Sequence, residues 1–169
     1  RPLPEVRMAD FNAAVTKTLA REGGGKITDD PKDRGGVTKY GITQRSYPML
    51  NIRALTEEQA RGIYKADYWD KLRGDEIADQ IVAECLFDAA VNMGVKTAVR
   101  LAQYSLGIDT DGTVGTKSIA AINAEDAHAF LANFTLGKIA RYVNICMKDR
   151  SQERFLLGWV RRALEGSAA

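Results

Sequence analysis

The chain has 169 residues, of which 45% are hydrophobic, and its formal net charge is +2. This length and composition suffice for one domain with a real core. The sequence has no apolar run long enough to cross a membrane, and its small positive charge does not indicate a nucleic-acid partner.

Residues 1–7 show neither the apolar core nor the cleavage site of a secretion signal. Met8 opens a stretch that resembles a natural start. We therefore expect residues 1–7 to be a cloning remnant and a single domain to cover residues 8–166.

The first element is a predicted amphipathic helix that ends at Ala20. Apolar residues recur along it at three- and four-residue intervals: Met8, Phe11, Val15 and Leu19. Glu22 is the last side chain before the glycines at 23–25, which should stop the helix. The negative end of the helix and burial in a cleft wall would both raise the pKa of this carboxyl, as a general acid requires.

A glycine-rich stretch follows, in which Val37-Thr38-Lys39-Tyr40 lies between Gly36 and Gly41 and predicts a short hairpin arm. Asp33 lies among polar turn residues and is our candidate for a second, ionised carboxylate. The hydroxyl of Thr38 could hold a water beside it. Taken separately, a glutamate before glycine such as Glu22 is more often an ordinary helix end, and an Asp-x-Gly-Gly sequence such as that at Asp33 is more often a turn.

From Glu22 to Thr43 the sequence resembles glycoside hydrolase family 108, the N-acetylmuramidases found among bacteriophage endolysins and prophage proteins. The motifs that carry this resemblance are Glu22-Gly23-Gly24, Asp30-Pro31, Gly35-Gly36-Val37-Thr38 and Gly41-Ile42-Thr43. The resemblance implies that Glu22 is the catalytic residue, and the order Glu, Asp, Thr is similar to the catalytic trio of phage lysozymes.

Two departures from these patterns stand out. The spacing from Asp33 to Thr38 is one residue shorter than in the phage lysozymes, which leaves Asp30 as a competitor for the second carboxylate. Gly25 stands where the family commonly has an aromatic residue after Glu-Gly-Gly.

Beyond the arm we predict helices. Thr56 to Gln59 is a capping-box pattern that opens a helix ending at aromatic residues, of which we assign Tyr68 and Trp69 to a sugar-binding cleft. The next helix, with a broad apolar face from Ile77 to Met93, should be central. Near its end Asn92 either bridges neighbouring helices or reaches an N-acetyl group of a substrate.

Residues 86–166 form the helical part of the expected domain, and residues 8–85 its catalytic part. The helical part resembles a predicted peptidoglycan-binding segment, in which an Asp-Gly-x-x-Gly turn, here Asp111 to Gly115, precedes a short helix. The loop that begins at Asp109 lacks the closing glutamate of an EF-hand, because Ala120 occupies that position. We expect Arg161 and Arg162 to lie on a solvated face or at a helix end.

No metal or cofactor is expected. His128 is the only histidine, so a zinc amidase or a Cys-His peptidase would lack its partners. Cys85 and Cys146 lie on apolar faces and are predicted to be small core residues, with a disulfide left open.

The sequence therefore predicts a mainly α, lysozyme-like α+β domain with a small glycine-rich β-hairpin arm beside a helical body. The resemblance implies a monomeric muramidase that cleaves the β-1,4 bond of peptidoglycan glycan strands, made in the bacterial host cytoplasm and acting at the periplasm or wall after release. The alternatives are a lytic transglycosylase and a non-catalytic wall-binding or secretion-accessory protein.

Overall fold

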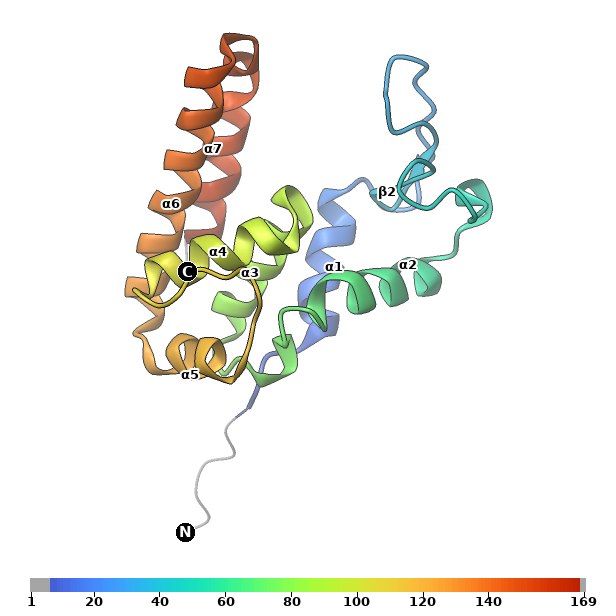
Figure 1. The fold of residues 1–169 in the computed structure, drawn as a ribbon. Helices are drawn as coiled ribbons and strands as arrows, with labels where there is room; N and C mark the ends of the chain where they lie inside the picture. The colour runs from blue at the N-terminus through green and yellow to red at the C-terminus, as the bar shows by residue number, and fades with distance from the viewer. Residues whose placement is uncertain (1–6, 168–169) are drawn as a thin grey trace.

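The computed structural model of the protein describes residues 7–167, so the expected cloning remnant lies almost wholly outside the described residues. Helices dominate the described chain, with one small hairpin on a separate arm (Figure 1). The α-helices are α1 (Phe11–Arg21), α2 (Glu57–Tyr64), α3 (Gln80–Met93), α4 (Val95–Ser105), α5 (Thr116–Ala124), α6 (Ala127–Lys148) and α7 (Glu153–Ser167). The predicted fold class, mainly helical with a small antiparallel hairpin, is confirmed.

Helix α1 starts later than its apolar pattern indicates. Asp10 caps it by accepting a hydrogen bond from the backbone N–H of Asn12, so Met8 precedes the helix and is 49% exposed. Val15 and Leu19 are buried as predicted. An aspartate whose side chain satisfies a free N–H fixes the start of a helix more strongly than one more apolar residue does.

The hairpin pairs β1 (Thr38–Lys39) with β2 (Ile42–Thr43) in antiparallel register, with Lys39 opposite Ile42. The two residues of its turn, Tyr40 and Gly41, both have positive φ, at 54° and 77°. This is the backbone of a type I′ turn, which matches the twist of short hairpins. The predicted arm is thus present, and its strands are short.

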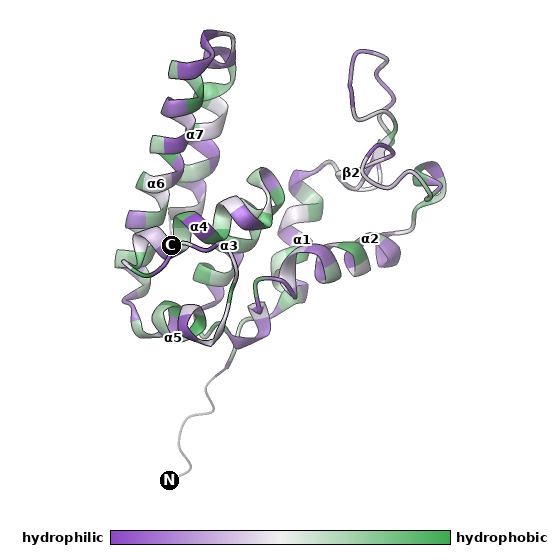
Figure 2. Cartoon of the chain, in the orientation of Figure 1, coloured by the Kyte–Doolittle hydropathy of each residue, from purple (hydrophilic) through white to green (hydrophobic). Residues whose placement is uncertain are grey.

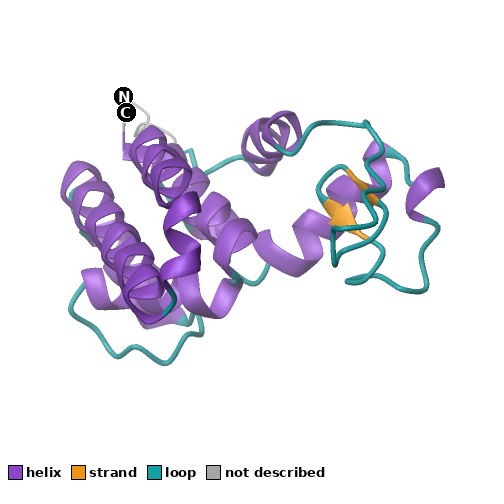
Figure 3. Cartoon of the chain, turned by 90° about the horizontal axis from the view of Figure 1, so that it is seen from above, coloured by secondary structure: helices purple, strands orange, loops and turns teal. Residues whose placement is uncertain are grey.

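Helix α3 runs through the centre of the molecule, as predicted. Its buried side chains contact α1 on one side and α4, α6 and α7 on the other. Seen from above, most of the helices gather on one side of the molecule, and the two short strands lie apart from them on the other side (Figure 3). The face is narrower than predicted, because Ile81 is 40% exposed.

Helices α6 and α7 form a long antiparallel pair that extends beyond the rest of the body (Figure 1). Phe130 and Phe134 stack within the part that joins the core, with ring centroids 5.4 Å apart. Along the protruding part hydrophobic and hydrophilic residues alternate around both helices (Figure 2). None of the described helices combines the length and apolar character needed to cross a membrane. Cys85 and Cys146 are both free and buried, which agrees with their predicted role as core residues.

A five-residue π-helical segment, η2 (Lys65–Trp69), follows α2 directly. The N–H of Asp70 bonds to the carbonyl of Lys65, five residues back, at 2.8 Å. This wider turn changes which side chains share a face. Trp69 turns inward as a result, is only 1% exposed, and packs between Phe11 and Phe87. The prediction that Trp69 lines the cleft is therefore wrong, because it is a core residue.

The indole of Trp69 is held by two contacts. Its Nε1–H donates to the carboxylate of Asp75 at 2.8 Å, and its ring lies against Gly74, where an added Cβ would come within 2.2 Å of Cε2. Any side chain at residue 74 would therefore have to displace a buried ring.

We expect Gly74→Ala to lower the free energy of unfolding by about 2–3 kcal/mol, because overpacking a buried ring forces the backbone or the indole to move. The matched control is Gly158→Ala, at an exposed position inside α7 with no atom within 4 Å of the added Cβ. There alanine should stabilise by about 0.5–1 kcal/mol. Urea melts of both variants measure the difference, and equal stability of the two would contradict this packing.

Candidate active site

A polar cavity of about 590 Å³ opens between the hairpin arm and the helical body. Its walls come from the end of α1, the hairpin, α2 with η2, the end of α3, and α7. The lining residues are Glu22, Gly41, Ile42, Thr43, Ser46, Tyr47, Ile63, Tyr64, Asp67, Tyr68, Lys71, Val91, Asn92 and Arg162.

Glu22 is placed by the way in which α1 ends. It is the C-terminal cap, and the N–H groups of Gly23 and Gly24 bond back to Ala20 and Leu19. This is the Schellman arrangement, which needs a left-handed residue after the cap, and Gly23 has a φ of 86°. The glycine stop predicted from the sequence thus leaves the Glu22 side chain at the mouth of the cavity, 27% exposed.

The hairpin turn lies directly over Glu22 and is held there by hydrogen bonds. The N–H of Tyr40 donates to the carbonyl of Gly24 at 3.0 Å, and its carbonyl accepts from the Tyr64 hydroxyl at 2.8 Å. A Cβ at Gly41 would lie 2.9 Å from the Cβ of Glu22 and 2.6 Å from the Tyr64 hydroxyl oxygen. The glycine of the Gly-Ile-Thr motif is therefore required by close approach as well as by its positive φ.

Asp67 is the other carboxylate among the lining residues. It accepts a short hydrogen bond from the hydroxyl of Tyr47. Burial raises the pKa of Tyr47, and the hydrogen bond to Asp67 raises it further. Burial, with the nearby charge of Glu22, does the same for Tyr64, and burial with Asp67 and Glu22 does so for Tyr68. These phenols stay protonated around neutral pH and serve as hydrogen-bond donors.

Arg162 reaches the cavity from α7. Its Nη2 lies 3.4 Å from Oε1 of Glu22 and 2.8 Å from Oδ1 of Asp88. Burial alone would lower the pKa of Arg162, but the hydrogen bonds and charge of Asp88 outweigh it and leave the pKa raised. The expectation that Arg162 lies on a solvated face or at a helix end is wrong, because it is partly buried and precedes the last turn of α7; its neighbour Arg161 is exposed, as expected. The sequence does contain a signal for this position. Arg162 follows Trp159 by three residues, so on a helix the two side chains share the inner side of α7.

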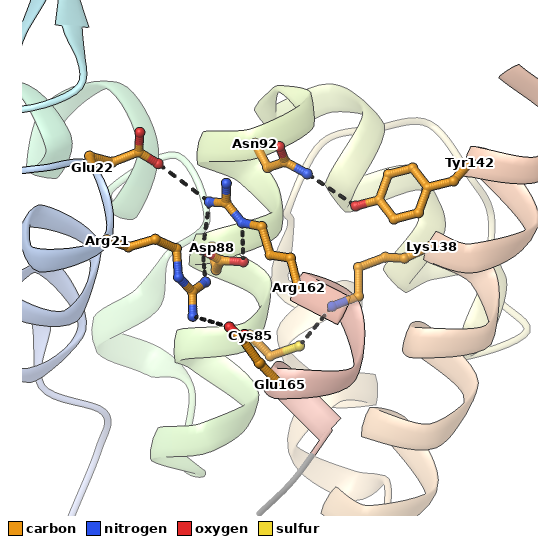
Figure 4. Close-up of polar contacts among 9 residues, drawn as sticks. All are labelled: Arg21, Glu22, Cys85, Asp88, Asn92, Lys138, Tyr142, Arg162 and Glu165. Carbon is orange, nitrogen blue, oxygen red and sulfur yellow. Dashed lines mark hydrogen bonds and ion pairs between the residues drawn. The ribbon is translucent and has the colours of Figure 1, made fainter. Parts of the chain in front are cut away.

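Two of the predicted binding residues do line the cavity. Tyr68 is half-buried in its wall, and Asn92 projects from the end of α3. The Asn92 amide donates to the Tyr142 hydroxyl of α6 at 3.0 Å (Figure 4). Asn92 therefore bridges helices and lines the cavity at once, so the two readings of it are compatible.

The structure does not bring Asp33 and Thr38 into this cavity. Asp33 is exposed, and its carboxylate accepts from the N–H of Gly35 at 2.8 Å, as in a turn. The Thr38 hydroxyl donates to the Gly36 carbonyl at 3.2 Å. Asp30 is likewise exposed and accepts from the N–H of Lys32. The predicted grouping of Glu22, Asp33 and Thr38 is thus absent, and Asp67 and Thr43 stand at the cavity instead.

The cavity has the chemistry of a carbohydrate site. It combines two carboxylates with tyrosine rings and amide and hydroxyl groups, which suit the mixed polar and apolar faces of a sugar. A neighbouring apolar hollow of about 480 Å³ shares Ile63 and Asp67 with it, so the accessible surface continues along α2. Among residues 7–167, no three acidic, histidine or cysteine side chains are grouped as a metal site.

Comparison with known proteins agrees with this geometry. Residues 15–94 match the family model described as Glycosyl hydrolase 108, and residues 97–164 match the one described as Predicted Peptidoglycan domain. The two matches meet near Gly94, between α3 and α4, whereas the expected division after Cys85 lies inside α3. No curated protein matches the chain.

Among solved structures, the chain is similar to that of SagA from Brucella abortus. The TM-score is 0.73 at 28% sequence identity, and the match covers 94% of this chain and 96% of the other. Together these matches identify the protein as a glycoside hydrolase whose residues 15–94 form a glycosyl hydrolase 108 segment, followed by a predicted peptidoglycan domain, and they support a peptidoglycan-degrading function.

Proposed function

We propose that the protein is a muramidase that hydrolyses the β-1,4 bond between N-acetylmuramic acid and N-acetylglucosamine, with Glu22 as the general acid. The observation that carries this proposal is the placement of Glu22. Its carboxyl stands on the wall of an open polar cavity, within the segment that matches the glycosyl hydrolase family.

In this mechanism the Glu22 carboxyl gives its proton to the glycosidic oxygen as the bond to the anomeric carbon breaks. Positive charge develops on the sugar ring, and a second carboxylate stabilises it or activates the incoming water. Asp67 is the lining carboxylate available for this role, and the Tyr47 hydroxyl fixes its orientation. Tyr68 and Asn92 are positioned to contact the sugar rings and their N-acetyl groups.

The biological setting is also a proposal. The motifs shared with phage and prophage muramidases favour an endolysin, made in the bacterial cytoplasm and acting on the wall after its release. Residues 97–164 would then help to hold the glycan strand, as the description of their family model suggests.

Glu22→Gln should lower the rate of wall lysis by about 10² to 10⁴-fold, because it keeps the shape of the side chain and removes the transferable proton. Clearing of a suspension of purified cell walls measures the rate. Glu125→Gln, a change of an exposed glutamate at the end of α5, is the matched control and should leave lysis unaltered. Full lysis by a folded Glu22→Gln protein would rule out general acid catalysis by this residue. A folded wild-type protein without lytic activity would instead favour the silent wall-binding role.

Mass spectrometry of digested peptidoglycan should show reducing N-acetylmuramic acid ends. This follows because water attacks the anomeric carbon in hydrolysis, whereas a lytic transglycosylase closes a 1,6-anhydro ring without water. Borohydride reduction before analysis distinguishes the two, since only the reducing end gains hydrogen. A pool dominated by anhydromuramic products would establish the transglycosylase alternative.

Asp67→Asn should slow lysis by about tenfold or more, whereas Asp33→Asn and Asp30→Asn should change it by less than about twofold. The reason is their placement: Asp67 lines the cavity, and the other two are exposed turn residues that accept backbone hydrogen bonds. Initial lysis rates at matched thermal stability decide among them. A strong loss in Asp33→Asn with a silent Asp67→Asn would return the second carboxylate to the hairpin arm.

A further inference from the structure

Arg162 lies between two carboxylates that belong to different helices. Its guanidinium forms a forked pair with Asp88 of α3, with Nε 3.2 Å from Oδ2 and Nη2 2.8 Å from Oδ1. The same Nη2 approaches Oε1 of Glu22 at 3.4 Å (Figure 4). A single arginine thus connects the cap of α1 with the centre of the fold.

Arg162 is itself held in place. Asp88 also accepts from Arg21 at 2.6 Å, and Arg21 reaches Glu165 of α7 at 3.3 Å. The side chains of Arg162 and Asp88 are only 23% and 20% exposed, so solvent screens this pair weakly. The planar fork of an arginine with a two-oxygen partner fixes direction as well as distance.

Glu22 needs such an external support. It follows the last turn of α1 and is succeeded by Gly23 and Gly24, which offer no side chain to pack against it. The hairpin turn at Gly41 comes close to its Cβ and Cγ, which a Cβ at residue 41 would meet. Among the described residues, Arg162 is the side chain that hydrogen-bonds the Glu22 carboxyl, and it therefore sets the direction of the carboxyl oxygens.

We propose that Arg162 is a positioning residue for the general acid, an inference that rests on the proposed function. Its N–H holds Oε1, so that the transferable proton sits on Oε2, the oxygen that points away from Arg162 (Figure 4). Once Oε2 has given its proton to the glycosidic oxygen, the positive guanidinium stabilises the carboxylate that remains. In the same step the bond between the anomeric carbon and the glycosidic oxygen breaks, and its electron pair stays on that oxygen, which has taken the proton. No other protein group gains or loses a proton in this step.

This role assigns part of the active site to the segment that matches a peptidoglycan domain. Arg162 falls within residues 97–164, and so does Tyr142, which supports Asn92. The hydrolase segment alone would hold Glu22 without the group that orients it. The second segment is thus a wall of the catalytic site, whatever it contributes to substrate binding.

The split between kcat and KM gives a readout that a merely structural role would not move. Several charged or ionisable groups surround Glu22: Arg162 on α7, Asp88 on α3, Arg21 on α1, Tyr64 on α2, and Asp67, Tyr68 and Lys71 at η2 and beyond. Arg162 is the cation in contact with the carboxyl. A residue that orients the general acid acts on the chemical step, so its loss should lower kcat and leave KM almost unchanged.

The test compares Arg162→Gln and Arg162→Lys with Arg161→Gln, its exposed neighbour, on soluble uncrosslinked peptidoglycan glycan chains. We expect kcat of Arg162→Gln to fall about ten- to hundredfold with little change in KM, as for the loss of a hydrogen bond to a charged group. Arg162→Lys should recover only part of this loss, because an ammonium cannot serve Asp88 with a fork and Glu22 at once. Arg161→Gln should match the wild type.

Loss of Arg162 leaves Asp88 with one cationic partner fewer, which could lower stability by itself. The double variant Arg162→Gln/Asp88→Asn removes the negative charge as well and so serves as a second test. Its thermal midpoint should recover relative to Arg162→Gln while kcat stays low. A wild-type kcat in Arg162→Gln, or a rise in KM at an unchanged kcat, would overturn the positioning role. If both Arg162→Gln and Glu22→Gln were fully active, the proposed function and the role of Arg162 would fail together. If Glu22→Gln were inactive and Arg162→Gln had the wild-type kcat, only the role of Arg162 would be overturned.

Discussion

The contact between the hairpin turn and the end of α1 is the constraint on which the cavity depends. Gly41 approaches the Cβ of Glu22 so closely that no other residue fits, and Tyr40 is tied both to Gly24 and to Tyr64. Tyr40 holds a φ of 54°, an uncommon value for a residue with a side chain. The arm stays over Glu22 because these hydrogen bonds offset that strain, and the cavity beside it depends on them.

A second junction joins the two matched segments of the chain. Asp88 lies on the central helix and receives both Arg21 from α1 and Arg162 from α7. Half-buried pairs of this kind contribute little net stability, since desolvation offsets most of their attraction. These ion pairs act on geometry instead, because they set the rotation of α7 relative to α1. Glu22 lies where these two helices come together.

Sequence reasoning succeeded where local rules decide the structure. The capping box at Thr56, the glycine stop after Glu22 and the hairpin around Tyr40 and Gly41 depend on neighbouring residues alone, and each is found. It failed where distant contacts decide. Trp69 is buried because a π turn re-aims it toward Phe11 and Phe87, which a 3.6-residue period cannot indicate. Asp67 and Arg162 reach the cavity only through the packing of separate helices, whereas Asp33 is indicated by the polar turn residues around it, which are a local signal.

The separation of Glu22 and Arg162 along the chain, 140 residues, has a consequence for how the protein comes into being. A growing chain therefore contains α1 and Glu22 long before α7 has been synthesised, and until then the cavity lacks the side that Arg162 provides. A product clipped before α7 would keep the Glu22 motif and the hairpin but would lose that wall. An intact amino-terminal motif is thus not sufficient to form the cavity.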